Sequence, residues 1–129
     1  MLTLKAFAKV NLVLEVLGRR ADGYHEIASI MQTVSLYDVL TLEPASHIKL
    51  ICNLPGLPDH TNIVLKAAEA LVKFAGCSKG AVIGLEKNIP VGAGLGGGSS
   101  DAAAVLRGLN RLWQLELTRE QLAVIGAGL

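Results

Sequence analysis

Apolar and polar positions alternate along the first part of the chain, which is the pattern of half-buried β-strands. Residues 4–17 predict one such strand with a well-buried face. Residues 27–42 are rich in β-branched side chains and predict two strands, with Asp38 as the turn between them. Residues 47–52 predict another strand, and the prolines and glycine of residues 53–60 predict a surface loop.

After this loop the apolar spacing changes to three and four residues, which is the period of a helix. Residues 63–74 have that spacing, so we expect an amphipathic helix that Thr61 or Asn62 caps and Gly76 ends. A cap is the simpler role for Asn62, and a contact with a ligand is the alternative.

The remaining residues alternate between the two-residue spacing of a strand and the three- to four-residue spacing of a helix. Residues 81–86 predict a strand, and residues from about 100 to 113 predict a helix. Capping-box spacing in residues 118–121 predicts a further helix, which Gly126 would stop. The order indicates an α+β fold in one domain, residues 1–129, with an antiparallel-rich sheet covered by helices on one face.

Composition narrows the class of partner. A net charge of +1 and 4% aromatic residues argue against nucleic-acid binding. Charged and polar residues interrupt every apolar window near the N-terminus, so we expect no signal or membrane segment and a soluble protein. Cys52 and Cys77 lack the spacing of a metal site or a redox motif, so we expect reduced thiols in the core and a cytoplasmic location.

The stretch of residues 90–104, PVGAGLGGGSSDAAA, is the clearest candidate for a ligand site. Five of the fourteen glycines lie between Gly92 and Gly98, so the loop can turn freely and bring several N–H groups to one ligand. Residues 99–101 offer capping oxygens to the helix that follows. A glycine loop that leads into a helix N-terminus binds anions, and phosphate is the expected ligand.

Three known types of phosphate-binding loop contain glycines at spacings similar to these. A Walker A loop is excluded because this loop ends in Gly-Ser-Ser without a lysine. Gly92, Gly94 and Gly97 match a dinucleotide fingerprint, but two helices follow where that motif needs another strand. The third type, PxxxGLGxxSS leading into an alanine-rich helix, fits the whole stretch.

Two other polar pairs could meet a ligand. Lys9 and Asn11 are two residues apart on a predicted strand and so share one face of it, and a solvated edge is the alternative. Tyr24 and His25 follow a turn and suit a planar heterocycle. The alternative is that Tyr24 packs on the core while His25 caps the turn.

The loop, from Pro90 to Ala103, resembles the phosphate loop of the GHMP kinase superfamily. Lys9-Val-Asn11 and Asp22-Gly-Tyr24-His25-Glu-Ile resemble further signatures of one branch. Members of that branch use ATP to phosphorylate the 2-hydroxyl of 4-diphosphocytidyl-2-C-methyl-D-erythritol in non-mevalonate isoprenoid synthesis. The resemblance implies a fold like the second domain of ribosomal protein S5, and ATP and Mg²⁺ as cofactors.

The resemblance also implies roles for individual residues. Lys9 and Asn11 would lie by the reacting hydroxyl as catalytic residues, and Tyr24 and His25 would hold the cytosine. Ser100 would lie near Mg²⁺. The implied ATP-binding residues are Pro90, Gly92, Gly94, Leu95, Gly96, Gly97, Gly98, Ser99 and Ser100, with Asn62 and Lys87 on the adenosine side.

One departure from the family limits these expectations. The aspartate proposed as general base follows the last helix in the family, whereas this sequence ends at Leu129. We therefore expect residues 1–129 to be the N-terminal, ATP-binding domain without the C-terminal domain. Such a chain would bind nucleotide weakly, catalyse little and self-associate through uncovered core surface. A non-catalytic nucleotide-binding module and another GHMP small-molecule kinase are the alternatives.

Overall fold

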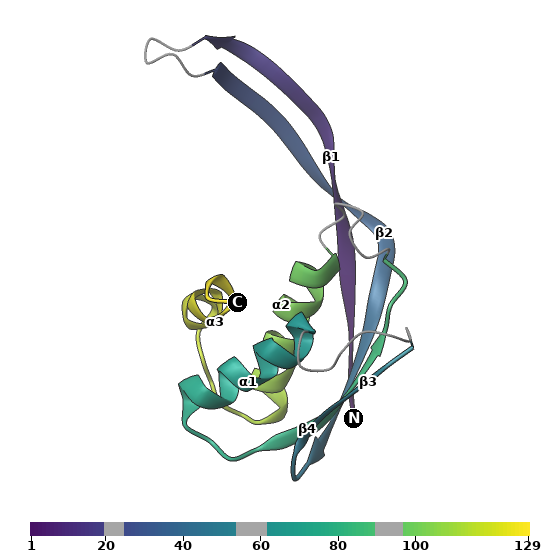
Figure 1. Cartoon of the computed structure of the whole chain (residues 1–129), viewed down its shortest axis with the longest axis vertical. Coiled ribbons are helices and arrows are strands. Elements are labelled where there is room, and N and C mark those ends of the chain that lie inside the picture. Colours follow the sequence, from purple (N-terminus) through teal and green to yellow (C-terminus); the bar gives the residue numbers. More distant parts are fainter. Residues whose placement is uncertain (20–24, 54–61, 90–96) are drawn as a thin grey trace.

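The computed structural model describes the backbone of residues 1–19, 25–53, 62–89 and 97–129, and their side chains except those of residues 9–19 and 25–34. The elements, in chain order, are β1 (Leu2–Arg19), β2 (His25–Ala45), β3 (Ile48–Cys52), α1 (Ile63–Ala75), β4 (Gly80–Glu86), α2 (Gly97–Leu112) and α3 (Arg119–Ala127) (Figure 1).

The four strands form one sheet in the order β1-β2-β4-β3. The pairs β1/β2 and β2/β4 are antiparallel, and β3/β4 is parallel. Helix α1 connects the two parallel strands, which cannot be joined by a tight turn. The predicted α+β class with an antiparallel-rich sheet is therefore confirmed.

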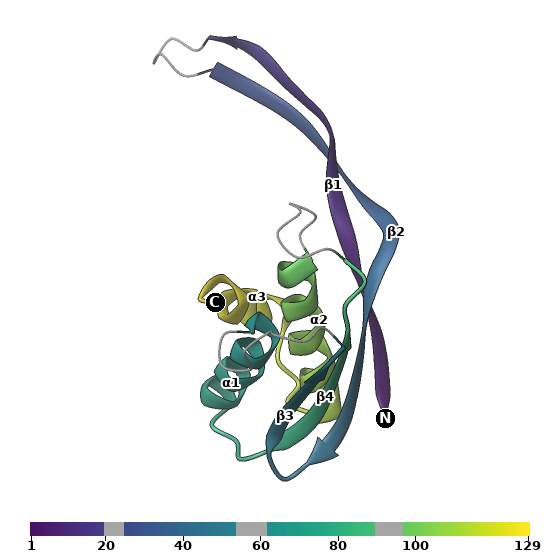
Figure 2. The same cartoon turned by 45° about the vertical axis from the view of Figure 1, so that its right-hand side comes forward.

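The helices lie on one face of this sheet, as predicted (Figure 2). Helices α1 and α2 contact each other and the strands, and α3 packs on both helices. Alternate residues of β2 and β4 point into the core and are fully or almost fully buried, as period-2 side-chain alternation requires. The larger core residues are Leu40, Leu42, Val64, Leu71, Ile83, Leu85, Val105 and Leu109.

Helix α2 lies close to the sheet because of a glycine. A Cβ on Gly108 would collide with Leu42 and would lie 2.9 Å from Leu4 Cδ1. Just beyond the helix, the buried Trp113 donates its indole N–H to the carbonyl of Gly80 at 3.1 Å. These contacts fix the C-terminal end of α2 against β4 and the sheet.

The predicted caps of α1 and the predicted N-terminal cap of α3 are present, whereas residues 99–101, predicted to cap the helix after the loop, lie inside α2. Asn62 accepts a hydrogen bond from Val64 N–H at 2.8 Å, and Gly76 ends α1 in the left-handed conformation with φ 63°. Thr118 and Gln121 form the predicted capping box of α3. Cys52 and Cys77 are free thiols, half-buried beside the core.

The structure corrects three sequence predictions. Asp38 is not a turn, because β2 continues through it and its charge is satisfied inside the protein. Helix α2 begins at Gly97 rather than near residue 100. Helix α3 passes Gly126 and ends at Ala127, since an isolated helical glycine costs only about 1 kcal/mol and Gly128 follows to cap it.

Strands β1 and β2 continue as a two-stranded ribbon beyond the helices (Figure 1). Their register runs from Leu2 opposite Leu42 to Arg19 opposite His25. It shifts at three places, between residues 7 and 9, 11 and 13, and 16 and 18. Such irregularities bend a strand and increase its local twist.

Candidate functional site

The first turn of α2 is the described part of the predicted phosphate loop. Gly97 is buried, Gly98 and Ser99 are exposed, and Ser100 is half-buried. The first amide groups of a helix have no partner within the helix, and its dipole is positive at this end. Small, partly exposed residues at this position leave room for an anion to approach those amides.

Gly97 is the residue at which α2 meets the chain that precedes the loop. A Cβ there would lie 2.9 Å from Ile89 Cγ2 and 3.2 Å from Lys87 Nζ, which is too close for most side chains. Glycine is therefore required for close packing at Gly97, and not only for a flexible loop.

A buried ionic cluster lies beneath this turn. The Lys87 ammonium is 2.7 Å from Asp38 Oδ2 and 2.9 Å from Asp101 Oδ2. The exposed fractions of the three side chains are 6%, 0% and 2% for Lys87, Asp38 and Asp101. Asp38 comes from the middle of β2, Lys87 follows β4, and Asp101 is on the second turn of α2.

The two carboxylates differ in their other contacts. Asp38 Oδ1 accepts from the backbone N–H of Asn88 at 2.6 Å and of Ile89 at 2.8 Å. Asp101 Oδ1 is buried and has no hydrogen-bond partner among the described residues. Among the described residues, Asp38 therefore has hydrogen-bond donors for both of its carboxylate oxygens, whereas Asp101 has a donor for one.

This difference sets the pKa of each group. Burial raises the pKa of Asp101, the neighbouring carboxyl of Asp38 raises it further, and Lys87 offsets only part, so that it reaches about 7. Burial also raises the pKa of Asp38, but the interactions with the Asp101 carboxyl, Lys87 and two backbone amides lower it more, to below its usual 3.8. Burial lowers the pKa of Lys87, but both carboxylates outweigh this and raise it.

The backbone on either side of Lys87 is also fixed. Asn53 accepts from the N–H of Lys87 at 2.8 Å and donates to its carbonyl at 3.4 Å. The side chain of Asn88 donates to the carbonyl of Tyr37 at 3.1 Å. Residues 87–89 are thus held to β2 and to the end of β3 by side-chain hydrogen bonds.

The structure describes only some of the predicted site residues. Pro90, Gly92, Gly94, Leu95, Gly96 and Tyr24 lie outside the described residues. Lys9 and Asn11 lie on β1 opposite Thr33 and Met31, in an unshifted stretch between two of the register shifts.

His25 begins β2, where its backbone pairs with Arg19 of β1. Ten residue steps separate Lys9 from Arg19, which is roughly 33 Å along a straight strand. On a straight ribbon His25 would therefore lie far from Lys9.

Asn62 and Lys87 both have structural partners. The side-chain oxygen of Asn62 caps α1, and Ile63, the next residue, is 3.6 Å from the Cβ position of Gly98. Asn62 therefore lies near the first turn of α2. The ammonium of Lys87 is already bound by two carboxylates.

Sequence reasoning missed Asp38 and Asp101 as members of the site. Asp38 is two residues before Leu40 and four before Leu42, so period-2 alternation places it on the buried face. Asp101 is likewise four residues before Val105 and eight before Leu109 on the buried face of α2. An acidic residue at such a position needs a buried partner, and this signal could have identified both.

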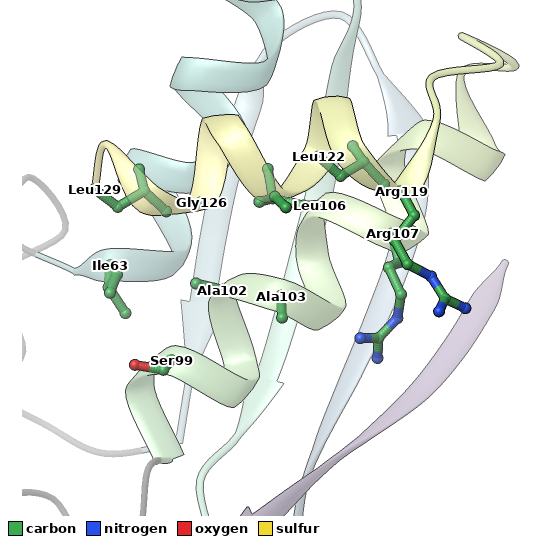
Figure 3. A pocket seen from close by; sticks show the side chains of 11 residues that line it. Ile63, Ser99, Ala102, Ala103, Leu106, Arg107, Arg119, Leu122, Gly126 and Leu129 are labelled. Carbon is green, nitrogen blue, oxygen red and sulfur yellow. The ribbon is translucent and has the colours of Figure 1, made fainter.

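A separate hollow of about 610 Å³ runs along the outer side of α2 and under α3 (Figure 3). Ser99 lies at one end, Arg107 and Arg119 lie at the other, and apolar side chains line the space between them. Two other kinds of site are absent from the part of the chain that the structure describes. There, no group of three or more His, Cys, Asp or Glu side chains is arranged so that it could hold a metal ion. Nor does any described helix have the length and apolar character needed to cross a membrane.

Comparison with known proteins identifies the family. A sequence profile described as "GHMP kinases N terminal domain" matches residues 62–129, more than half of the chain. The chain belongs to the GHMP kinase family. The match includes the first turn of α2, Lys87 and Asp101.

Curated relatives are similar over nearly the whole chain. The 4-diphosphocytidyl-2-C-methyl-D-erythritol kinase of Symbiobacterium thermophilum is 54% identical over 122 residues, which is 93% of this chain and 43% of that protein. The protein of the same name from Prosthecochloris aestuarii is 46% identical over 129 residues, 99% of this chain and 45% of its own length. The chain thus spans less than half of these relatives.

Solved structures agree with this grouping. A crystal structure of 4-(cytidine 5'-diphospho)-2C-methyl-D-erythritol kinase superposes with a TM-score of 0.76 at 43% identity, covering 97% of this chain and 46% of that one. The mevalonate kinase of Methanococcus jannaschii has a TM-score of 0.67 at 18% identity, over 97% of this chain and 44% of that one, which shows a shared fold alone.

Proposed function

We propose that this chain is the N-terminal, ATP-binding part of a kinase that transfers the γ-phosphoryl group of ATP to the 2-hydroxyl of 4-diphosphocytidyl-2-C-methyl-D-erythritol. The product would enter non-mevalonate isoprenoid synthesis. The similarity to relatives of that name carries the proposal. The first turn of α2, with small residues at a helix N-terminus, supports it as a place for phosphate.

The proposed roles follow the chemistry of phosphoryl transfer, in which positioning and charge stabilisation matter most. The amides of residues 97–100 bind phosphate oxygens, together with residues 90–96. Lys9 and Asn11 orient the acceptor hydroxyl, and Tyr24 and His25 hold the cytosine. When bound, Mg²⁺ neutralises phosphate charge, and the half-buried Ser100 hydroxyl fits a site in which phosphates supply most ligands.

One substrate must reach both Lys9 and His25 under this proposal. Along a straight ribbon these residues are too far apart for that. The register shifts between them provide places where the ribbon can bend. We therefore include a bent ribbon as part of the proposed substrate-bound state.

Titration calorimetry on this chain tests the proposal, with a non-hydrolysable ATP analogue in Mg²⁺ and with the cytidyl substrate as separate ligands. We expect both to bind. The variant His25→Ala should weaken binding of the cytidyl substrate and leave the analogue unaffected, because only the substrate carries cytosine. Equal losses for both ligands would count against the assignment, and no binding of either by the wild type would refute the function.

A turnover assay separates the kinase part from a non-catalytic module. This chain spans less than half the length of its curated relatives, and we expect it to bind nucleotide with negligible phosphorylation. Turnover at an ordinary rate for a kinase, about 1–100 s⁻¹, would show that no further residues are required.

We also propose that this chain self-associates. Val124 on α3 is 68% exposed and Phe74 on α1 is 49% exposed. The hollow between α2 and α3 is lined mainly by apolar side chains. Apolar surface of this kind favours association in water.

A further inference from the structure

The ionic cluster of Asp38, Lys87 and Asp101 connects the two chain segments that flank the phosphate loop. Lys87 precedes residues 90–96, and Asp101 follows them on α2. Asp38 lies more than forty residues earlier, in the rigid sheet. A single ammonium therefore ties the start of α2 to β2 at the point where the chain leaves β4.

The contacts around the cluster act on the same two segments. Asp38 Oδ1 holds the N–H groups of Asn88 and Ile89, at 2.6 and 2.8 Å. Gly97 packs against Ile89 and the Lys87 ammonium with no space for a side chain. The residues on both sides of the loop are thus fixed to each other and to the sheet.

The burial of Lys87 argues against a direct contact with ATP. Its side chain is 6% exposed, and its ammonium lies within 2.9 Å of two carboxylate oxygens. To reach a nucleotide, this ammonium would have to leave two carboxylates buried without their counter-ion. A nucleotide contact would therefore cost more binding energy than an exposed lysine would require.

We propose that Asp38, Lys87 and Asp101 are positioning residues, which hold the first turn of α2 in place so that its amides are ready for phosphate before ATP arrives. Lys87 acts through this turn and does not touch the nucleotide. Preorganised donors bind an anion without a cost of ordering at that moment. The inference rests on the proposed function for its purpose, but the cluster can be tested in the absence of nucleotide.

The first test is hydrogen exchange of the nucleotide-free chain. Lys87→Met removes the ammonium at similar length, and Lys66→Met, at an exposed position on α1, is the matched control. We expect amides of residues 101–104, the first that α2 protects by its own hydrogen bonds, to exchange about tenfold faster in Lys87→Met, the effect of losing roughly one net hydrogen bond, with α1 and α3 unchanged. Unchanged exchange at residues 101–104 would overturn the proposal.

Lys87→Met leaves two carboxylates together and could fail to fold. The double variant Lys87→Met with Asp101→Asn avoids this, because the remaining Asp38 keeps its two backbone N–H donors. We expect the same faster exchange at residues 101–104 in the double variant. If it folds and exchanges there at the wild-type rate, the cluster does not position the turn.

Binding of the Mg²⁺-bound ATP analogue separates positioning from direct contact. Under the proposal, Asp38→Asn weakens analogue binding as Lys87→Met does, although Asp38 lies inside the sheet. If Lys87 instead contacts ATP, Asp38→Asn leaves binding intact or strengthens it by freeing the ammonium. A wild type that binds no analogue would refute the proposed function, and the exchange experiment would still decide the role of the cluster.

Discussion

At the scale of single residues, the site is governed by an imbalance of buried charge. Two carboxylates share one ammonium, and among the described residues it is Asp38 alone that receives further donors from the backbone. The charged form of Asp101 is therefore poorly stabilised, and its pKa is raised to about 7. Asp101 consequently holds a proton in the folded protein over a pH range in which the unfolded chain has released it.

This pKa predicts how stability depends on pH. From about pH 4 to pH 7 the folded state binds one proton more than the unfolded state at Asp101, so the free energy of unfolding falls as pH rises. Between pH 5 and pH 7 we expect the contribution of Asp101 to lower the free energy of unfolding by about 2 kcal/mol. Urea denaturation at the two pH values, in buffer with a chelator, measures this free energy.

The control for this prediction is Asp101→Asn, which cannot titrate. The lowered pKa of Asp38 changes the free energy of unfolding only below about pH 4, and the raised pKa of Lys87 changes it only above about pH 10. Neither group therefore contributes to the change between pH 5 and pH 7. The histidines are the same in both proteins and cancel in the comparison. If the wild type and Asp101→Asn lose equal stability from pH 5 to pH 7, the charge of Asp101 is not the cause.

At the scale of elements, α2 is held at both of its ends. Gly108 allows the helix to approach Leu42 and Leu4, and the indole of Trp113 bonds to the chain at Gly80. At the other end, Gly97 packs on Ile89 and the ionic cluster. A helix held at both ends can keep its N-terminal amides in a fixed place, which an anion site requires.

Two adjacent glycines test this packing. In Gly97→Ala the new methyl group would lie 2.9 Å from Ile89 Cγ2, so we expect a loss of about 1–3 kcal/mol from overpacking, despite the better helix propensity of alanine. In Gly98→Ala the nearest atom, Ile63 Cγ2, is at 3.6 Å, an ordinary contact. We expect Gly98→Ala to be neutral or more stable by up to about 1 kcal/mol. Thermal or urea unfolding measures the stability of both variants. Equal changes in stability for the two variants would contradict the close packing at Gly97.

Local signals were enough to predict most of the elements. The caps at Asn62, Gly76 and Thr118 depend on residues near in sequence, and all three are present. Asp38 was misread as a turn because its partner Lys87 is 49 residues away and no local pattern shows it. Turn propensity is a weak preference that a buried ion pair and continued strand pairing override.

The same argument applies to the site. The glycine loop and the alanine-rich stretch after it predicted a helix start near residue 100, and α2 begins three residues earlier, at Gly97. The cluster beneath the first turn of α2 was not predicted, because three segments must fold together before Asp38, Lys87 and Asp101 meet. The sequence did contain one signal for each aspartate: the spacing of the apolar residues places Asp38 on the buried face of its strand and Asp101 on the buried face of its helix.

At the scale of the whole molecule, the helices and the base of the sheet form one body, and the β1–β2 ribbon extends from it (Figure 1). The chain spans less than half the length of its curated relatives. Helix α3 packs mainly on α1 and α2, and Ile125 is its one buried residue. Its other apolar side chains border the hollow or face solvent.

This surface predicts concentration-dependent association. Val124 is 68% exposed on α3, and burying an apolar side chain of its size contributes about 1.5–3 kcal/mol. We expect sedimentation equilibrium to show oligomers at micromolar concentrations, and Val124→Glu to shift the chain toward monomer because a charge would have to be buried. Ser78→Glu, at an exposed site before β4, adds the same charge away from α3 and should leave the association unchanged. If both variants weaken association equally, net charge and not the apolar face of α3 controls it; a monomeric wild type would rule out the interface altogether.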